Sequence, residues 1–559
     1  MKLGKGFYTS PRWSWEILDC AMPMTFDTYS NCAHQCVYCF AYFQKAMGTT
    51  KDEYLHHRVR SVNVNRIKKM FTEPDKYAGQ FAFYIKQRMV LQWGGMSDPL
   101  DWYEQNFRKS LELLQFFKEI DYPISISTKG VWSVDDPEYQ AVYKDAGNLQ
   151  MKYSIITANP EYTDALEAGT PTSMERFTAL KKLKDMGVAI TTLRFRPFVI
   201  GASDGTMHKM FELAKWANVD SISTEFLCIE RRASSIAMER YKKISEVVGY
   251  NVWDYYIENS QQKTGLMRLN YDLKRPYYEE MQRLSAHHNI PFFVSDAHHK
   301  ERSASAGCCG LPEKGPLSNI NRGQYAEAIL IAKKHGKVFW SDIAPYAEGL
   351  KNIPFYRAEN FNTSSSAVRA KRRFQNMYDY MHDIWNNPKQ GMSPARYFGG
   401  VLVPGSTDEN GDIVYIYNKP LVDEDIKVET VEQLKEHMEL TEDKKLDGSD
   451  LAHVAFPIFA HWENENIINL LNGARVLYVI AVPAALYEQI TNLYPNSDII
   501  MLPESHNFED GIINYSADEG YEKVWILKKD FTLPSGETVR EFMSSVESNG
   551  DVSKDLITV

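Results

Sequence analysis

The sequence predicts an α/β protein, with a partial TIM-like (β/α)6 barrel in its amino-terminal part and a C-terminal α/β domain. Three observations lead to this prediction. Apolar segments of strand length alternate with amphipathic segments of helix length between residues 88 and 226, and this alternation indicates parallel βα units. The chain has 559 residues, too many for one small core. Its composition, 44% hydrophobic and 24% charged, is typical of a globular protein.

The barrel strands are predicted where short apolar segments lie between turn residues. They span residues 22–29, 88–93, 123–128, 151–157, 188–196 and 219–226. Helices are predicted over residues 40–47, 50–80, 103–120, 136–145, 173–186 and 206–217, with Gly187 at the C′ position of the fifth. The active site of such a barrel lies at the carboxyl ends of its strands.

We expect three domains: a barrel core over residues 1–230, an extension that covers the substrate over 231–395, and an α/β domain of unknown function over 396–559. In the extension, helices are predicted over 238–248, 277–288 and 324–335, and strands over 290–295 and 337–341. Strand-like segments at 401–403 and 413–417 flank a turn. An acidic stretch over 422–450 follows, and the segments 467–471, 475–482, 484–494 and 498–502 alternate helix and strand.

Charge and hydropathy narrow the possible partners. A net charge of −10 and a pI of about 5.9 argue against non-specific wrapping of nucleic acid, but they leave room for a local basic groove. The chain start lacks the apolar region of a signal peptide, and the longest apolar run, 476–486, is too short to span a bilayer. The seven cysteines do not suggest a disulfide framework. We therefore expect a cytoplasmic protein without membrane contact.

One loop concentrates the chemistry. Cys32, Cys36 and Cys39 follow the C-x3-C-x2-C spacing, so one loop offers three thiolates to a metal centre. Closed structural sites take four protein ligands, and a fourth cysteine is missing from this run. A Cys3His zinc site that includes His34 is the alternative, and it would make the chain a zinc-binding interaction protein. Ordinary burial of three cysteines is the remaining interpretation.

Further blocks accompany the cysteines in a fixed order. Residues 94–99 read Gly-Gly-Met-Ser-Asp-Pro, residues 154–157 read Ser-Ile-Ile-Thr, and residues 166–176 read Leu-Glu-Ala-Gly-Thr-Pro-Thr-Ser-Met-Glu-Arg. Together with the cysteine motif and the aromatic Phe40 after it, these blocks resemble the radical S-adenosylmethionine (SAM) superfamily, and within it the spore photoproduct lyase-like branch. The resemblance covers about residues 20–230, and Ala168 departs from the proline usual in the branch.

The resemblance implies the cofactors and the type of reaction. Cys32, Cys36 and Cys39 would hold a 4Fe-4S cluster, and SAM would take the fourth iron. Reductive cleavage of SAM, fed by an electron donor such as flavodoxin or ferredoxin, would abstract a hydrogen from the substrate. The branch points to a nucleic acid base or nucleotide, in repair or modification. A peptide or a small metabolite is the alternative substrate.

The same resemblance suggests which residues bind SAM. The candidates are Gly94, Gly95, Ser97, Asp98, Lys129, Ser154, Arg194 and Arg196. Arg194 and Arg196 share one face of a strand and need anions there. Structural roles compete with these assignments, because Asp98 could be a helix N-cap and Ser154 could bind the backbone. Glu167 is predicted to pair with Arg176, nine residues later.

Three other cysteines are candidates for returning a hydrogen atom to a product radical. Cys308 and Cys309 are adjacent, and Gly307 and Gly310 bracket them. A loop after a barrel strand can fold over the mouth of the barrel, so we expect this loop there. Cys228, after the sixth strand, is the rival hydrogen donor. Packing, or a ligand site completed by His298, His299 or Cys20, is the alternative for the adjacent pair.

Overall fold

The computed structural model describes residues 3–4, 11–13, 20, 22–41, 58–231, 233–260, 266–320, 324–353 and 374–418, with three further strands between residues 479 and 526. The chain divides into two compact units, Met1–Glu424 and Asp425–Val559. Residues 42–47 of the helix predicted over 40–47, and the acidic stretch 422–450, lie outside the described residues. Within the described part of the chain, no helix has the length and apolar character needed to cross a membrane.

An eight-stranded sheet in the order β1-β2-β3-β4-β5-β6-β7-β10 forms the centre of the first unit. β1 is antiparallel to β2, and the other seven strands run parallel. The strands are β1 Arg12–Trp13, β2 Met24–Phe26, β3 Leu91–Trp93, β4 Ile124–Thr128, β5 Leu149–Ser154, β6 Ile190–Phe198, β7 Ser221–Phe226 and β10 Phe292–Val294. The predicted partial barrel is confirmed, and the strand predicted over 290–295 adds a seventh parallel strand.

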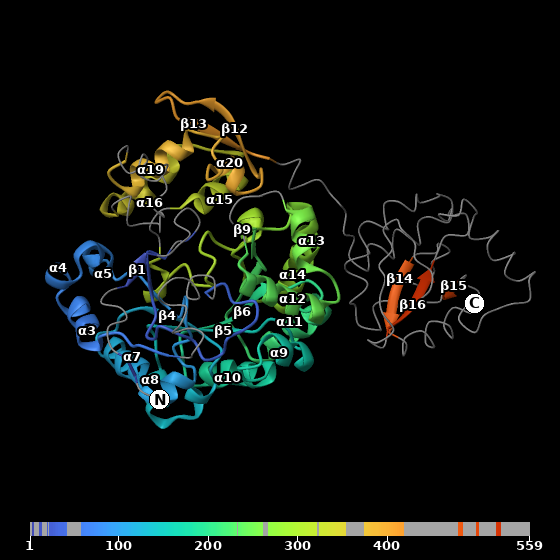
Figure 1. Ribbon diagram of the computed structural model, residues 1–559. Helices are drawn as coiled ribbons and strands as arrows, with labels where there is room; N and C mark the ends of the chain where they lie inside the picture. The colour runs from blue at the N-terminus through green and yellow to red at the C-terminus, as the bar shows by residue number, and fades with distance from the viewer. Residues whose placement is uncertain are drawn as a thin grey trace, which may run out of the picture. The chain divides into compact units, whose positions relative to one another are not determined.

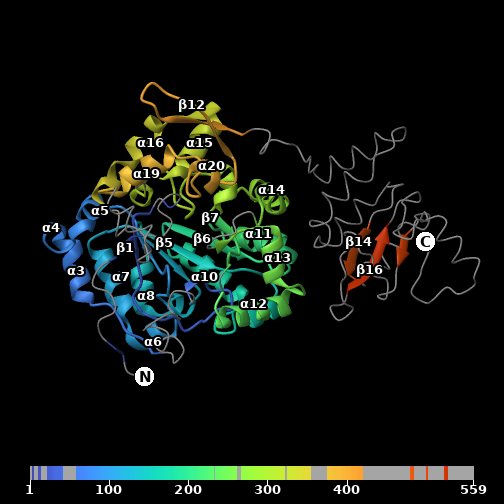
Figure 2. The same ribbon diagram turned by 45° about the horizontal axis from the view of Figure 1, so that its top comes forward.

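Helices connect these strands and lie around the outside of the sheet (Figures 1 and 2). Those between β2 and β7 are α3 Val64–Thr72, α4 Pro74–Tyr77, α5 Ala82–Lys86, α6 Trp102–Phe107, α7 Lys109–Glu119, α8 Pro137–Tyr143, α9 Pro160–Leu166, α10 Ser173–Asp185 and α11 Met207–Trp216. Gly187 follows α10 with φ 85°, as expected of a C′ glycine. The helix α9 was not predicted, because Pro160–Leu166 is short and has little periodicity.

The helix predicted over 103–120 is two helices, α6 and α7. Arg108 between them is left-handed, with φ 55°. The buried Glu104 carboxylate accepts hydrogen bonds from the backbone N–H groups of Ser110 (2.7 Å) and Leu111 (2.9 Å). These N–H groups belong to the first turn of α7 and have no partner within the helix. The carboxylate therefore caps α7, which explains why a new helix begins there.

Side chains of the parallel strands alternate between two environments. The outward positions are apolar and belong to the main core, among them Ile124, Ile126, Leu149, Met151, Tyr153, Leu193, Phe195 and Ile222. The inward positions are polar, and hydrogen bonds join Ser125 to Gln150 (2.5 Å) and Gln150 to Thr192 (2.9 Å) across neighbouring strands. Closed TIM barrels usually fill this space with branched apolar residues. Here the interior is polar.

A loop closes the amino end of the barrel. The carbonyl of Cys308 accepts a hydrogen bond from Ser223 Oγ (2.7 Å), and that of Cys309 accepts one from Gln150 Nε2 (2.8 Å). Gln150 and Ser223 lie in the first halves of β5 and β7. The segment reaches this end by turning back beside β10, where the Ala304 N–H donates to the Phe292 carbonyl at 2.8 Å. The expectation that this loop covers the mouth is therefore wrong.

The rest of the first unit contains α12 Ser235–Val248, α13 Val252–Asn259, α14 Tyr271–His288, α15 Tyr325–His335, α16 Trp340–Ala347, α19 Met377–Trp385 and α20 Pro394–Tyr397. The strands β8 Ile229–Glu230 and β9 Leu266–Met267 pair with each other. A second sheet joins β11 Lys337–Val338, β13 Ile413–Tyr417 and β12 Leu402–Thr407. Since β13 pairs with β11, the expected domain boundary at residue 396 falls inside the first unit.

The described part of the second unit is a three-stranded sheet. β14 Val479–Pro483 and β15 Ile499–Met501 both pair antiparallel with β16 Tyr521–Ile526. The strands expected within 475–482 and 498–502 are present. The helices expected over 467–471 and 484–494 lie outside the described residues.

Candidate active site

A cavity of about 380 Å³ lies at the carboxyl ends of the parallel strands. The turn after β3, the ends of β4 to β7 and the cysteine loop all contribute to its lining. The lining includes Cys32, Cys36, Cys39, Gly94, Gly95, Ser97, Asp98, Lys129, Ser154, Arg194, Arg196 and Cys228. The structure thus gathers the three metal-ligand candidates and all eight SAM-binding candidates around one space. Cys308 and Cys309 are not among its lining residues.

Backbone contacts hold the cysteine loop at the edge of the cavity. The Cys39 N–H donates to the Cys36 carbonyl at 3.1 Å, and the Val37 N–H donates to the Leu166 carbonyl at 2.9 Å. Arg240 Nη1 donates to the Cys36 carbonyl at 3.1 Å. These contacts fix the main chain and leave the three thiols unbonded to one another.

His34 lies inside the motif but is bound to protein oxygens on both sides. Its Nδ1 is 2.7 Å from the Gly169 carbonyl oxygen, and its Nε2 is 3.1 Å from Asp98 Oδ2. Burial opposes a charge on His34, but the contact with Asp98 outweighs it and raises the pKa of His34. The two ring nitrogens of His34 thus contact Gly169 and Asp98, which weighs against its role in a Cys3His zinc site.

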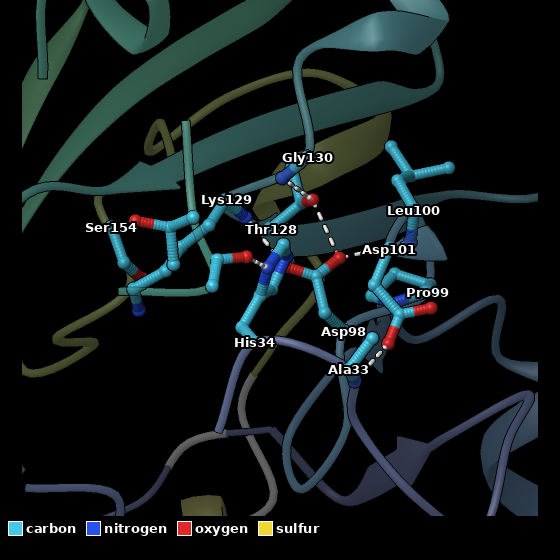
Figure 3. A network of polar contacts seen from close by, with 12 residues as sticks. Ala33, His34, Asp98, Pro99, Leu100, Asp101, Thr128, Lys129, Gly130 and Ser154 are labelled. Atoms are coloured by element: carbon cyan, nitrogen blue, oxygen red, sulfur yellow. Dashed lines mark hydrogen bonds and ion pairs between the residues drawn. The ribbon is translucent and has the colours of Figure 1, made fainter. Parts of the chain in front are cut away.

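Asp98 organises the ends of β3 and β4 (Figure 3). Its Oδ1 accepts from Thr128 Oγ1 (2.6 Å) and the Leu100 N–H (2.9 Å), while its Oδ2 accepts from the Lys129 N–H (2.6 Å). Burial favours the neutral acid, but the contacts with His34 and Thr128 prevail and lower the pKa of Asp98. Both carboxylate oxygens are used within the protein. The N-cap of α6 is Asp101 rather than Asp98.

The glycine-rich turn is held by a carboxylate that we did not predict. Asp27 Oδ1 accepts hydrogen bonds from the Met96 and Ser97 N–H groups, each at 2.9 Å, and Asp27 also pairs with Arg12. Gly94 has φ 85°, and a Cβ there would meet the Ser127 carbonyl oxygen at 2.4 Å. The sequence did contain a signal for Asp27, because this acidic residue directly follows an apolar strand that neighbours the glycine-rich turn.

A second buried carboxylate connects Lys129 with the helix α10. Glu167 Oε2 is 2.6 Å from Arg176 Nη2, and both side chains are fully buried. This confirms the predicted pair. Lys129 Nζ lies 3.7 Å from Glu167 Oε1, and Tyr38 donates its hydroxyl to the same carboxylate. Burial works against the charge of Lys129, but Cys36 and Glu167 raise its pKa.

The two arginines of β6 have different environments. Arg196 Nη2 is 2.6 Å from Glu225 Oε2, an ion pair that the sequence analysis missed. Arg194 borders the cavity two residues earlier, and among the described residues it forms no ion pair. Burial, together with Arg196, lowers the pKa of Arg194 to about 10. Ser154 is the register partner of Arg194 on β5, and it lines the same cavity.

Comparison with known families supplies the identity of this architecture. The family model described as the Radical SAM superfamily matches residues 27–214, the segment that builds the cysteine loop, the glycine-rich turn and strands β3 to β6. Residues 27–214 are thus a radical SAM domain, which indicates a radical SAM enzyme. Its cofactors are therefore a 4Fe-4S cluster and SAM, as the resemblance to this superfamily implied.

Solved structures resemble this radical SAM enzyme only in part. Spore photoproduct lyase complexed with dinucleoside spore photoproduct is 16% identical over 50% of this chain and 78% of that chain, with a TM-score of 0.38. The radical SAM methyltransferase TsrM from Kitasatospora setae, with cobalamin and a 4Fe-4S cluster bound, is 12% identical over 40% of this chain and 37% of that one, with a TM-score of 0.28. Comparison with curated protein sequences finds no match.

The residues around the cavity suit these two cofactors. The cysteine loop offers three free thiols at the edge of the cavity. That arrangement fits a cluster in which each thiolate binds a different iron and one iron is left for SAM. Gly94 and Gly95 line the cavity, and their lack of side chains lets this turn pack closely against Ser127 and Thr25.

The hydrogen-donor candidates of this radical SAM enzyme lie in different places. Cys228 lines the cavity, and burial raises the pKa of its thiol to about 12, which keeps it protonated. Cys308 and Cys309 belong to the loop at the amino end of the barrel. His298 and His299 lie in neither place, since they are buried beside Lys274 and Tyr271. Among the described residues, they do not join the adjacent cysteines in a ligand group.

Proposed function

We propose that Cys32, Cys36 and Cys39 ligate the cluster and that the wall formed by the turn after β3 and the ends of β4 to β6 binds SAM. The observation that carries the proposal is that all these residues border one cavity. Gly94 and Gly95 offer backbone to the SAM ammonium, and Ser154 offers a hydroxyl to the ribose. Asp98 supports the turn from behind, because its oxygens are already engaged.

Once bound, the cluster and SAM would need one electron from a donor such as flavodoxin or ferredoxin, and reductive cleavage of SAM would supply methionine and a radical able to take a hydrogen atom from the substrate. This chain's residues position the reactants and exclude water. Cysteines that ligate a cluster must stay reduced, which favours the cytoplasm.

We further propose that the substrate is a nucleic acid base or a nucleotide. The order of the sequence blocks supports this class, and so does the presence of Arg194 and Arg196 in the cavity wall. Cys228 is the proposed hydrogen donor, because its protonated thiol lies in that wall. A peptide or small metabolite is the alternative that the test below distinguishes.

The test is anaerobic reconstitution of the full chain, followed by assay of 5′-deoxyadenosine. We expect about four irons per chain and stimulated SAM cleavage with DNA or nucleotides. Cys228→Ala should retain SAM cleavage but change the product, whereas Cys308→Ala and Cys309→Ala should not change it. Stoichiometric zinc without iron would contradict the cluster assignment. Stimulation by peptides alone would favour the alternative substrate.

A further inference from the structure

The interior of the barrel holds more positive than negative charge. On the inward faces of strands β2 to β7, the described residues include three cations, Lys152, Arg194 and Arg196, and one carboxylate, Glu225. The carboxylate is committed to Arg196, 2.6 Å away. Within the described part of the chain, neither Lys152 nor Arg194 forms an ion pair or a side-chain hydrogen bond. Among the described strand residues, these two cations are therefore left without a carboxylate of their own at ion-pair distance.

Burial makes this imbalance costly. Lys152 is 2% exposed, and it lies between Gln150 and Ser154 on the inward face of β5. A charged group in such a place is stable only if an anion or several hydrogen-bond acceptors compensate it. Burial, together with Arg194 and Arg196, lowers the pKa of Lys152. The Arg194 guanidinium cannot avoid the cost of a buried charge by losing its proton at neutral pH.

An unpartnered hydroxyl lies beside these cations. Ser127 is 4% exposed, it lines the cavity, and its Oγ has no hydrogen-bond partner among the described residues. The sheet register pairs Ser127 with Lys152, and Ser154 with Arg194. Neighbouring strands thus place hydroxyl, ammonium and guanidinium donors on one face. Such a set of donors binds oxyanions by charge-assisted hydrogen bonds.

We infer that the substrate carries an oxyanion group, a phosphate or a carboxylate, and that Arg194 and Lys152 bind this group inside the barrel. The inference rests on the proposed function of the cavity. SAM does not account for both cations, because its one carboxylate is accompanied by an ammonium and a sulfonium. The loop at Cys308–Gly310 closes the amino end of the barrel, so the substrate enters through the carboxyl end with its anionic group leading.

The test uses the anaerobically reconstituted full chain, saturated with SAM, at constant ionic strength. Inorganic phosphate and acetate are the probes, and the shift of the unfolding temperature reports binding. We expect one or both probes to stabilise the wild-type enzyme. Arg194→Gln and Lys152→Met should each weaken that binding about tenfold or more, the scale of a charged hydrogen bond. Lys182→Met, which removes an exposed lysine paired with Asp135, is the matched control.

Two further measurements separate this site from the SAM site and from the fold. SAM affinity, measured by equilibrium dialysis, should be unchanged in Lys152→Met. Without phosphate, Lys152→Met should unfold at a higher temperature than the wild type, because it removes an uncompensated buried charge. A lysine that merely supported the fold would show the opposite shift.

Three outcomes would overturn the inference. The first is that neither probe stabilises the wild type, as expected if a Cys308 thiolate already supplied the negative charge. The second is that the probes stabilise both variants and the control equally. The third is that both variants lose affinity for SAM instead of affinity for the probes. Wild-type iron content and SAM cleavage are measured in the same preparations. A wild-type preparation without iron or without SAM cleavage would contradict the proposed function itself, independently of the anion site.

Discussion

The two ends of the barrel both carry cysteines, yet they are built differently. At the carboxyl end, Cys32, Cys36 and Cys39 border an open cavity, and buried carboxylates hold the surrounding turns. At the amino end, backbone carbonyls of the Cys308–Gly310 loop are tied to strand hydroxyls and an amide. The difference teaches that the end of the barrel at which a thiol lies, rather than its closeness to other thiols, decides whether it borders the cavity proposed for the cofactors.

The largest expected effect is loss of the cluster from the carboxyl end only. Cys36→Ala should reduce iron from about four per chain to background and abolish SAM cleavage, because a ligand is lost. Cys309→Ala is the matched control, and it should keep both iron and cleavage. Iron analysis and 5′-deoxyadenosine assay measure the pair. Equal iron loss in the two variants would mean that cysteines at both ends of the barrel are needed for the cluster.

The next effect concerns the buried carboxylates of the carboxyl end. Glu167→Gln leaves the fully buried Arg176 without its charged partner. The free energy of unfolding should fall by about 3–5 kcal/mol, as for a buried pair broken on one side. Glu175→Gln, on the surface of the same helix, should cost only about 1 kcal/mol as a weakened capping box. Denaturant titration measures the free energy of unfolding of both variants. Similar losses would mean that the buried pair contributes no more to stability than the surface capping box.

A smaller effect is expected at the amino end, where packing rather than charge is decisive. Gly310 has φ 71°, and a Cβ there would meet Ser221 Oγ at 2.3 Å. Gly310→Ala should therefore lower the free energy of unfolding by about 2–3 kcal/mol through backbone strain and the clash. Gly249 has φ 78° but open space around it, so Gly249→Ala should cost about 1 kcal/mol. If both variants lose the same amount, the loop is not tightly packed against Ser221.

The smallest effect is a pH dependence confined to the carboxyl end. The pKa of Asp98 is lowered in the folded state, where burial is outweighed by the contacts with His34 and Thr128. Its contribution to stability is therefore fully present above the unfolded pKa, about 3.9, and is lost as the pH falls through the folded value. The slope of stability against pH below about 4 should therefore be shallower in Asp98→Asn than in the wild type. Denaturant titrations between pH 3 and 7 measure it, and identical slopes would contradict the assignment.

Prediction of site residues was uneven for an identifiable reason. Residues whose role depends on local spacing were found, as with the cysteine loop and the pair Glu167–Arg176. Asp27 and Glu225 were missed, although they support the glycine-rich turn and Arg196. Asp27 acts on the turn after β3, which neighbours β2, and Glu225 acts on a residue of the neighbouring strand β6. A single sequence does not state which strands are neighbours or in which register they lie.

The sequence by itself determined the parallel βα units, the three-cysteine loop and the shared face of Arg194 and Arg196. These features follow from periodicity and spacing over a few residues, which local backbone geometry fixes. Only the tertiary structure decided that the Cys308–Cys309 loop closes the amino end and that Glu225 neutralises Arg196 and not Arg194. The bond from Gln150 to the Cys309 carbonyl spans 159 residues. Such contacts depend on how the whole sheet closes, because no local pattern encodes where a distant loop will pack.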